Sequence, residues 1–260
     1  MLLSEKVAIV SGIGPAMGRS IALAYAREGA RLTLCARREE RVRAVADEVE
    51  AAGGEVLWTT ADITNRADCQ RLVDATLERY GRVDILVQNG HYDGDYKNVA
   101  DSDPDDWRAI MEVNLFGALH LVQLVTPIMR SQNEGRIILI NTGASTDPPP
   151  TLGAYAASKA ALASLVRTIA VELGPDGIRA NGVQLGPVQG ENWRGWVESG
   201  SRAAGLTPED FEINECKDIP LRGVPTSEEC AGAVVFLASD LARPITGQSL
   251  AVNNGRWFVA

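Results

Sequence analysis

The chain has 260 residues, of which 45% are hydrophobic and 23% are charged, and its formal net charge is -9. This balance is ordinary for a globular protein with a sizeable core, and the negative charge argues against nucleic acid or another polyanion as a partner. No apolar run in the sequence approaches the ~18 residues of a membrane-spanning helix, and residues 1–6 are too short and too acidic for a signal sequence. We therefore expect a soluble, cytoplasmic protein with no membrane partner.

The four cysteines and two histidines suggest neither a disulfide framework nor a metal site. The cysteines are far apart and show no C-x-x-C spacing, and the histidines stand apart from any acidic or cysteine cluster. These residues are Cys35, Cys69, Cys216, Cys230, His91 and His120. We predict that the protein binds no metal.

Short β-branched runs alternate with helical segments from residue 7 to residue 252, which predicts one α/β sheet and a single domain. The first run, residues 7–10, ends in a glycine-rich turn at 11–18, and a helix is expected over 19–28. Free NH groups at a helix N-terminus bind anions, so this turn is either a nucleotide site or a plain turn. Its position after the first strand favours the nucleotide. Gly12 would permit the tight turn, and Gly18 would permit close packing of helix on strand.

The second strand, residues 32–35, leads to Arg37 and Arg38. At this place a dinucleotide-binding fold carries an acidic residue for the ribose of NAD, or an arginine for the 2′-phosphate of NADP. The two arginines could instead begin the solvated face of a helix over 39–52. We favour the phosphate interpretation for Arg37.

The third strand, residues 56–60, is followed by Asp62 and by a helix over 66–80. Asp62 is well placed for an adenine amino group, but an acid that caps the helix would look the same. The fourth strand, 85–87, ends in the polar segment 88–90.

Asp103 and Pro104 read as a cap and a first-turn proline, and the helix that they begin contains Asn114. An amide inside a helix costs helix propensity. From this residue alone, a solvent-facing side chain is the preferred interpretation of Asn114.

Tyr155 and Lys159 lie one turn apart on a helix that runs through residue 173, after an apolar strand that ends at Thr142. A phenol with an ordinary pKa of about 10 is a poor base at neutral pH, but a neighbouring ammonium could lower that pKa by roughly 1 to 3 units. Tyr155 is then a candidate general acid and base, with Thr142 at the strand end where open α/β sheets bind ligands. The alternative is that Tyr155 is a half-buried packing residue.

A strand over 178–183 is followed by a segment with little strand character, about 187–222, that contains Trp193, Trp196 and Phe211. These large apolar side chains fit either a flap that closes over an apolar substrate or ordinary local packing. The sequence does not favour one over the other.

Near the C-terminus, Thr226 and Glu229 form the pattern of a capping box for a helix over 230–237, and a last strand is expected near 249–252. The apolar tail 257–259 would be an association surface if it were exposed.

Taken together, these features resemble the short-chain dehydrogenase/reductase family over nearly the whole chain. The motifs that carry the resemblance are the glycine turn Ser11-Gly12-x-x-x-Ala16-Met17-Gly18, the segment Gln88-Asn89-Gly90-His91, the segment Val113-Asn114-Leu115-Phe116-Gly117, Thr142, and Tyr155 with Lys159. The resemblance implies a single-domain Rossmann fold with a doubly wound parallel sheet of about seven strands, residues 1–260, and a substrate flap around 187–222.

The resemblance also implies an NAD(P)-dependent oxidoreductase that moves a hydride between nicotinamide and a secondary alcohol or ketone, which we expect to be apolar or cyclic. Tyr155 would exchange the proton, and Thr142 would orient the carbonyl oxygen. Lys159 would hold the nicotinamide ribose and lower the pKa of Tyr155, while Asn114 would position a water that relays protons. NADP(H) is the preferred cofactor because of Arg37, and NAD(H) is possible.

Further residues take a role from the resemblance. Those expected to bind the cofactor are Gly12, Ile13, Met17, Gly18, Arg37, Asp62, Ile63, Asn89, Gly90, Tyr155, Lys159, Gly186 and Val188. Those expected in the substrate pocket are His91, Trp193 and Trp196. The chain departs from the family pattern at Ala16, His91, Leu185 and Gly190. A homotetramer or homodimer is expected.

Two other functions remain open on the same fold. One is a nucleotide-independent lyase similar to halohydrin dehalogenases, against which Lys159 and Gly18 argue. The other is a nucleotide-binding regulator without turnover, against which the set Asn114, Thr142, Tyr155 and Lys159 argues.

Overall fold

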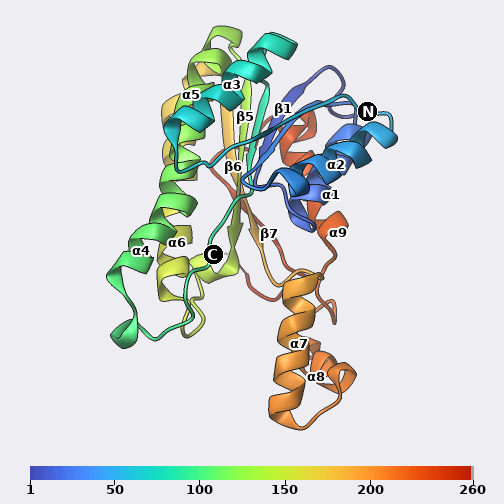
Figure 1. The fold of residues 1–260 in the computed structure, drawn as a ribbon, viewed down its shortest axis with the longest axis vertical. Coiled ribbons are helices and arrows are strands. Elements are labelled where there is room, and N and C mark those ends of the chain that lie inside the picture. The colour runs from blue at the N-terminus through green and yellow to red at the C-terminus, as the bar shows by residue number, and fades with distance from the viewer. Residues whose placement is uncertain (259–260) are drawn as a thin grey trace.

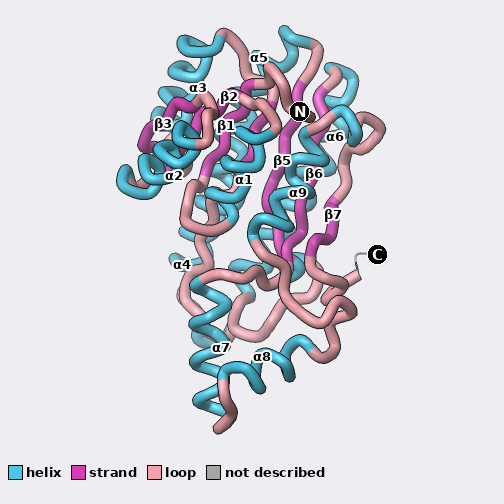
Figure 2. Tube along the Cα trace, turned by 90° about the vertical axis from the view of Figure 1, so that its right-hand side faces the viewer, coloured by secondary structure: helices cyan, strands magenta, loops and turns pink. Residues whose placement is uncertain are grey.

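The structure is a computed structural model that describes residues 1–258. A seven-stranded, wholly parallel sheet with the order β3-β2-β1-β4-β5-β6-β7 runs through it (Figure 2). The strands are β1 Val7–Ser11, β2 Arg31–Ala36, β3 Val56–Thr60, β4 Ile85–Gln88, β5 Gly135–Thr142, β6 Ile178–Leu185 and β7 Ser249–Val252. The predicted doubly wound Rossmann sheet is confirmed.

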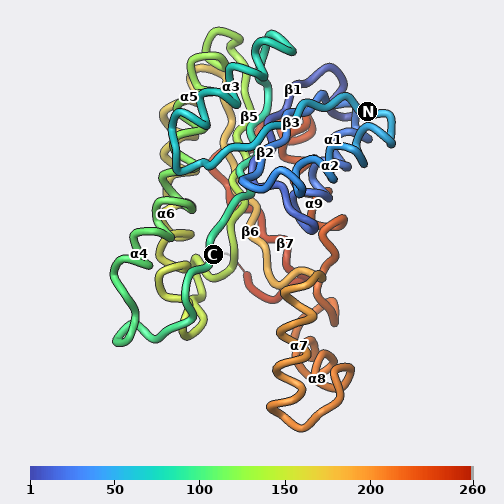
Figure 3. The backbone as a smooth tube through the Cα atoms, in the orientation of Figure 1, coloured from blue at the N-terminus to red at the C-terminus, as the bar shows by residue number. Residues whose placement is uncertain are grey.

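Helices cover both faces of this sheet (Figures 1 and 3). One layer is formed by α1, α2 and α9, and the other by α3, α5 and α6. The helices are α1 Met17–Arg27, α2 Glu39–Ala51, α3 Arg66–Tyr80, α4 Pro104–Met111, α5 Gly117–Gln132, α6 Gly153–Leu173, α7 Glu191–Ala204, α8 Pro208–Cys216 and α9 Ser227–Ala238.

The strands are apolar on both sides because each side of the sheet meets a helix layer. Along β1, Ala8 and Val10 belong to the core under α1 and α9, whereas Ile9 between them belongs to the core under α3 and α5. The same alternation of side chains holds along β4 and β5. Short, continuously apolar runs in the sequence therefore correspond to fully buried strands.

The helix predicted around Asn114 is longer and less regular than expected. A π-helical turn, Glu112–Phe116, joins α4 to α5, so that residues 104–132 form one continuous helical segment. By length and composition alone this segment could cross a membrane, with a mean hydropathy of 1.4 over its most apolar window. In the fold its apolar residues pack against α3, α6 and β5.

The segment predicted as a flap forms a helical hairpin of α7 and α8. This hairpin projects beyond the carboxyl ends of the strands, away from the rest of the sheet (Figure 1). The predicted capping box is present at α9, where the side chains and backbone of Thr226 and Glu229 bond reciprocally. The carboxyl edge of the sheet thus lies between α4 on one side and the hairpin on the other, and the predicted site residues gather there.

Candidate active site

The turns that follow β1 and β4 are in close backbone contact at the point where the strand order reverses. Gly12 has φ +80°, and a Cβ on it would overlap the backbone of Gly90. Asn89 Nδ2 donates to the Gly12 carbonyl oxygen at 2.7 Å, and a Cβ on Gly18 would lie 2.7 Å from that same oxygen. Both positions therefore need glycine, because a side chain there would overlap neighbouring backbone atoms. They lie at the crevice where open α/β sheets bind nucleotides.

The N-terminus of α1 faces this crevice. Among the described residues, no side chain caps the helix at its N-cap Ala16, so NH groups of its first turn remain available to an anionic oxygen. Ala16 Cβ lies 3.9 Å from where a Cβ on Gly190 would stand, so the start of α7 faces the glycine turn at close range. The arrangement fits the diphosphate of a dinucleotide.

The ends of β2 and β3 carry the residues expected around the adenosine. Arg37 is exposed one residue past β2. Asp62 Oδ1 accepts hydrogen bonds from the amide and hydroxyl of Thr64 at 3.0 and 2.8 Å, whereas the residue that caps α3 is Asn65. Asp62 is therefore not a helix cap, which removes the alternative interpretation of this acid. Ile63, beside it, is buried.

Tyr155 and Lys159 project from α6 toward the end of β5. Lys159 Nζ lies 5.8 Å from the centroid of the Tyr155 ring and donates to the carbonyl oxygen of Ile140 at 2.9 Å. Asn141 fixes the two elements together, because its Nδ2 donates to the Lys159 carbonyl oxygen and its Oδ1 accepts from the Thr142 amide. The predicted trio Thr142, Tyr155 and Lys159 is thus assembled at one place.

The electrostatics of the two ionisable groups differ from the sequence-based expectation. Burial raises the pKa of Tyr155 above its ordinary value of 10, the negative charge of Asp93 adds to the rise, and a hydrogen bond with Thr142 opposes it. Burial lowers the pKa of Lys159 to about 8. The expected lowering of the Tyr155 pKa by Lys159 is not found, because desolvation acts against the charged form of both groups.

Asn114 is fully buried in the π-helical turn, so the solvent-facing interpretation was wrong. Its Oδ1 accepts from the Tyr92 amide at 2.8 Å, and its Nδ2 donates to the Tyr92 carbonyl oxygen and to Ser158 Oγ. Ser158 Oγ in turn donates to the carbonyl oxygen of Tyr155. A π-turn inside a helix often marks a functional site. Here it turns the amide of Asn114 toward the Tyr92 backbone and the Tyr155 helix.

Sequence reasoning missed Ser158. Its spacing of three residues from Tyr155 places it on the same helix face, but a serine in a helix is common and carries no chemical signal by itself. Only the long-range contact with Asn114 gives it a role.

His91, expected in the substrate pocket, lies beside Tyr155. The two ring centroids are 6.5 Å apart with the rings at 62°. His91 Nδ1 is 3.4 Å from the carbonyl oxygen of Asn89, and its Nε2 is 3.6 Å from Asp93 Oδ1. Asp93 was not predicted at the site, because an acidic residue in a polar loop is unremarkable in the sequence.

The two tryptophans expected in the substrate pocket pack within the α7–α8 hairpin. Trp193 is 7% exposed, stacks on Trp196 at 5.1 Å between ring centroids, and donates from Nε1 to Glu212 at 2.7 Å. Trp196 packs also against Phe211, at 5.2 Å between centroids. Trp193 and Phe211 thus belong to the local core of the hairpin, whereas Trp196 is 43% exposed, and the substrate-pocket role of both tryptophans stays a prediction.

The C-terminal tail folds back on the ends of β5 and β6. The Trp257 ring covers Gly143, and a Cβ on Gly186 would lie 3.3 Å from it. Trp257 Nε1 donates to Asp147 Oδ2 at 3.0 Å. Of the predicted association surface, Phe258 is 86% exposed, while residue 259 lies outside the described residues.

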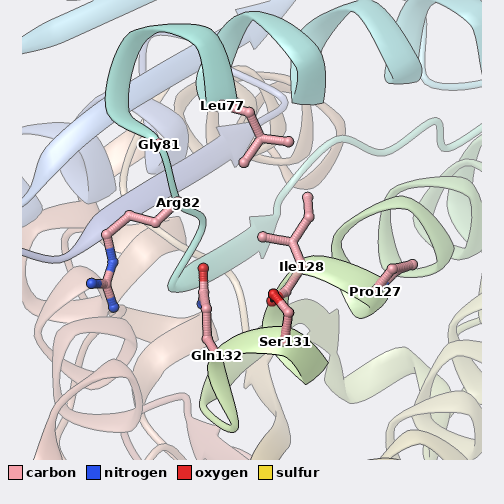
Figure 4. Close-up of a pocket in the computed structure, with 7 residues that line it drawn as sticks. All are labelled: Leu77, Gly81, Arg82, Pro127, Ile128, Ser131 and Gln132. Atoms are coloured by element: carbon pink, nitrogen blue, oxygen red, sulfur yellow. The ribbon is translucent and has the colours of Figure 1, made fainter.

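A hollow lies at the opposite, amino-terminal edge of the sheet, between the ends of α3 and α5 (Figure 4). Gln132, which lines it, is already bonded to both backbone groups of Val83. Polar side chains in this hollow thus hold the fold together, and the chemistry-bearing residues lie at the other edge. Among residues 1–258, no three His, Cys, Asp or Glu side chains gather as a metal site would require, and the absence of a metal stays a prediction.

Comparison with known proteins identifies the family. A family model described as "Enoyl-(Acyl carrier protein) reductase" matches residues 12–256. The 7α-hydroxysteroid dehydrogenase of Escherichia coli is 32% identical over 253 residues, which are 97% of this chain and 94% of that protein. The 3-oxoacyl-[acyl-carrier-protein] reductase of Thermotoga maritima is 29% identical over 98% of this chain and 99% of that protein. The chain belongs to the short-chain dehydrogenase/reductase family.

Solved structures of this family agree with the fold. NAD⁺-bound xylitol dehydrogenase superposes with a TM-score of 0.90 at 28% identity, covering 98% of this chain and 100% of that one. Levodione reductase gives 0.88 at 27% identity, with 98% of each chain covered. A short-chain dehydrogenase/reductase of this kind is an NAD(P)-dependent oxidoreductase of alcohols and ketones, and the lyase and regulator alternatives are not favoured.

Proposed function

We propose that the protein is an NADP(H)-preferring dehydrogenase of secondary alcohols, or equivalently a carbonyl reductase, with Tyr155 as its general acid and base. The observation that carries this proposal is the joint placement of Tyr155, Lys159 and Thr142 at the carboxyl edge of the sheet, beside an uncapped helix N-terminus suited to a dinucleotide. Hydride transfer is the chemistry that the nicotinamide group supplies when bound.

Each residue of the trio has a role that follows from its chemistry. In the reducing direction the Tyr155 phenol donates its proton to the carbonyl oxygen as the carbon is reduced, and in the oxidising direction it takes the proton back. The Thr142 hydroxyl donates to the same oxygen and orients it. Lys159 would hold the nicotinamide ribose with its ammonium group.

Asn114 contributes by holding the site together. Its side chain bonds the backbone of Tyr92 and the hydroxyl of Ser158, and that hydroxyl donates to the carbonyl oxygen of Tyr155. The relay of protons through a water held at Asn114 stays a prediction.

The cofactor preference rests on Arg37. Its guanidinium is exposed at the end of β2, and the neighbouring residues Ala36 and Arg38 offer no acid to bind a ribose 2′-hydroxyl. NADH must be tested beside NADPH, because the xylitol dehydrogenase that shares the fold is NAD⁺-bound.

The substrate is proposed as a secondary alcohol or its ketone. A relative named for a hydroxysteroid supports an apolar, cyclic compound, whereas one named for xylitol supports a hydroxyl-rich one. A cytoplasmic location and a homotetrameric or homodimeric assembly stay predictions.

Nicotinamide fluorescence during titration with NADPH and with NADH tests the cofactor proposal. The wild type should bind NADPH several-fold more tightly than NADH, and Arg37→Ala should weaken NADPH binding about tenfold while leaving NADH binding nearly unchanged. Arg38→Ala is the matched control, because Arg38 is also exposed and lies one residue further on, at the N-cap of α2. Tighter binding of NADH by the wild type, or an equal loss of both cofactors in Arg37→Ala, would overturn the preference.

A further inference from the structure

The loop that follows β4, residues 91–98, is held rigidly against the active site. Asn114 bonds both backbone groups of Tyr92. Gly94 has φ +70°, and a Cβ on it would overlap Ile110 of α4. The amide of Asp95 donates to Asp106 Oδ2 at 3.0 Å. The backbone of this loop is therefore fixed against Asn114 and α4, although the loop has no regular secondary structure, and its His91 ring lies beside Tyr155.

Asp93 is the charged side chain of this loop that acts on the catalytic groups. Its Oδ1 lies 3.6 Å from His91 Nε2, and its side chain is 30% exposed. Its negative charge contributes to the raised pKa values of Tyr155 and of Tyr96. It favours the charged form of Lys159 as well. Asp93 is therefore electrostatically coupled to the reacting end of the site.

This carboxylate lacks a strong cation partner. Within residues 1–258, no lysine or arginine lies within ion-pair distance of Asp93, and its one such neighbour is His91. Partial burial and the Lys159 charge hold the pKa of His91 below its ordinary value of 6.5, so its imidazole is neutral at neutral pH. The buried Lys159 is committed to the carbonyl oxygen of Ile140. An incoming substrate therefore meets the partly exposed negative charge of Asp93 before the buried positive charge of Lys159.

We propose that Asp93, which lies against His91 where that ring faces Tyr155, selects substrates by charge. It favours neutral and cationic hydroxy or keto compounds and disfavours those with a carboxylate or phosphate close to the reacting carbon. This specificity rests on the proposed role of Tyr155, since the charge is defined relative to the carbon that reacts there. A substrate anion within about 6 Å of Asp93 would meet a repulsion that, after partial screening by water, weakens kcat/KM about tenfold.

The test uses three secondary alcohols on one carbon skeleton that differ in charge: 4-amino-2-butanol, 1,3-butanediol and 3-hydroxybutyrate. The wild type should give the lowest kcat/KM with the hydroxy acid. Asp93→Asn should raise kcat/KM for the hydroxy acid, relative to the diol, about tenfold and should lower that for the amino alcohol. Each compound is also measured as a competitive inhibitor of the best alcohol in a wider panel, and the inhibition constants should change in the same sense.

Asp95→Asn is the matched control. Asp95 lies in the same loop but pairs with Lys97 at 2.9 Å, and its side chain is 60% exposed. Removal of the Asp95 charge should leave the relative kcat/KM values of the three alcohols unchanged. If Asp93→Asn changes kcat/KM and the inhibition constants equally for all three compounds, the charge proposal is wrong.

Tyr155→Phe in the same assays separates the two ideas. If it retains turnover, the proposed acid and base is wrong whatever Asp93 does. If it is inactive while the Asp93→Asn ratios stay at wild-type values, the charge proposal alone fails.

Discussion

The two edges of the sheet treat buried charge in opposite ways. At the amino-terminal edge, fully buried Asp84 accepts hydrogen bonds from the Val7 amide and from Arg82, and Arg136, 4% exposed, reaches Glu134 and Asp240 at 2.8 and 2.7 Å. At the carboxyl edge, Lys159 is 3% exposed, and its ammonium bonds a neutral carbonyl oxygen. Asp84 and Arg136 thus each have a partner of opposite charge, whereas the ammonium of Lys159 bonds a neutral group.

The pKa shifts at the two edges have different causes. Burial by itself would raise the pKa of Glu134, but hydrogen bonds from Arg136 and Lys6 outweigh it and lower that pKa to about 2. The Lys159 pKa falls to about 8 because burial penalises the ammonium. Paired charges of the first kind stabilise a fold, whereas an uncompensated group of the second kind is typical of an active site.

The largest effect is expected at the carboxyl edge. Tyr155→Phe removes the phenol that exchanges the proton, so kcat should fall by about 10³-fold or more while cofactor affinity changes little. Steady-state kinetics and a fluorescence titration measure both quantities. Tyr80→Phe is the control, because Tyr80 bonds the Leu32 carbonyl oxygen away from the site. Turnover that survives in Tyr155→Phe would refute the assignment.

At the amino-terminal edge, a substitution should affect stability and leave chemistry intact. Asp84→Asn weakens the bonds to Val7 and Arg82 in a fully buried position, and we expect a loss of about 2–3 kcal/mol in the free energy of unfolding. Urea denaturation measures this loss, and kcat of the folded variant should equal that of the wild type. A variant as stable as the wild type would break the comparison between the edges.

Lys159→Met should have the opposite effect on stability. It removes an ammonium that burial disfavours but leaves the Ile140 carbonyl oxygen without its donor, so at pH 7 the variant should be more stable by about 1–2 kcal/mol, and inactive. Because the folded pKa of about 8 lies below the ordinary 10.5, the unfolded chain binds the extra proton between these values. Wild-type stability should therefore rise relative to the variant from pH 8 to 10.5. Parallel pH profiles would contradict this.

The smallest effect on stability is expected for Glu134→Gln, and it should disappear at acidic pH. With a folded pKa of about 2 against an ordinary 4.5, the ionised carboxylate contributes stability that is fully present above pH 4.5 and is lost as the pH falls toward 2. The side chain is 39% exposed, so screening limits the contribution to about 1 kcal/mol. In thermal melts, the wild type should have a higher melting temperature than the variant at pH 6 and the same melting temperature near pH 2.

Local patterns predicted most of the fold. The strand over 56–60, the α3 helix over 66–80 and the capping box of α9 match the structure, because continuous apolar runs, helical periodicity and cap residues act over a few neighbouring positions. The first helix begins at Met17, two residues before the expected start, since the glycine turn closes sooner than its length suggests.

Long-range contacts account for the placements that the sequence did not predict. Asn114 is buried because a π-turn directs its amide to Tyr92, a partner 22 positions away. Trp193 lies in the hairpin core because α8 returns Phe211 and Glu212 to the aromatic rings of α7. No sequence spacing encodes either contact.

By itself the sequence determined that this chain forms a doubly wound sheet, that its first turn suits a nucleotide, and that Thr142, Tyr155 and Lys159 form one set. Periodicity and motif spacing carry that information, since each residue acts close to its own position in the chain. Only the tertiary structure decided the electrostatics. It buried Lys159 with its ammonium on a neutral carbonyl oxygen and set Asp93 beside His91 at the mouth of the site, because a pKa depends on desolvation and on charges brought together by folding.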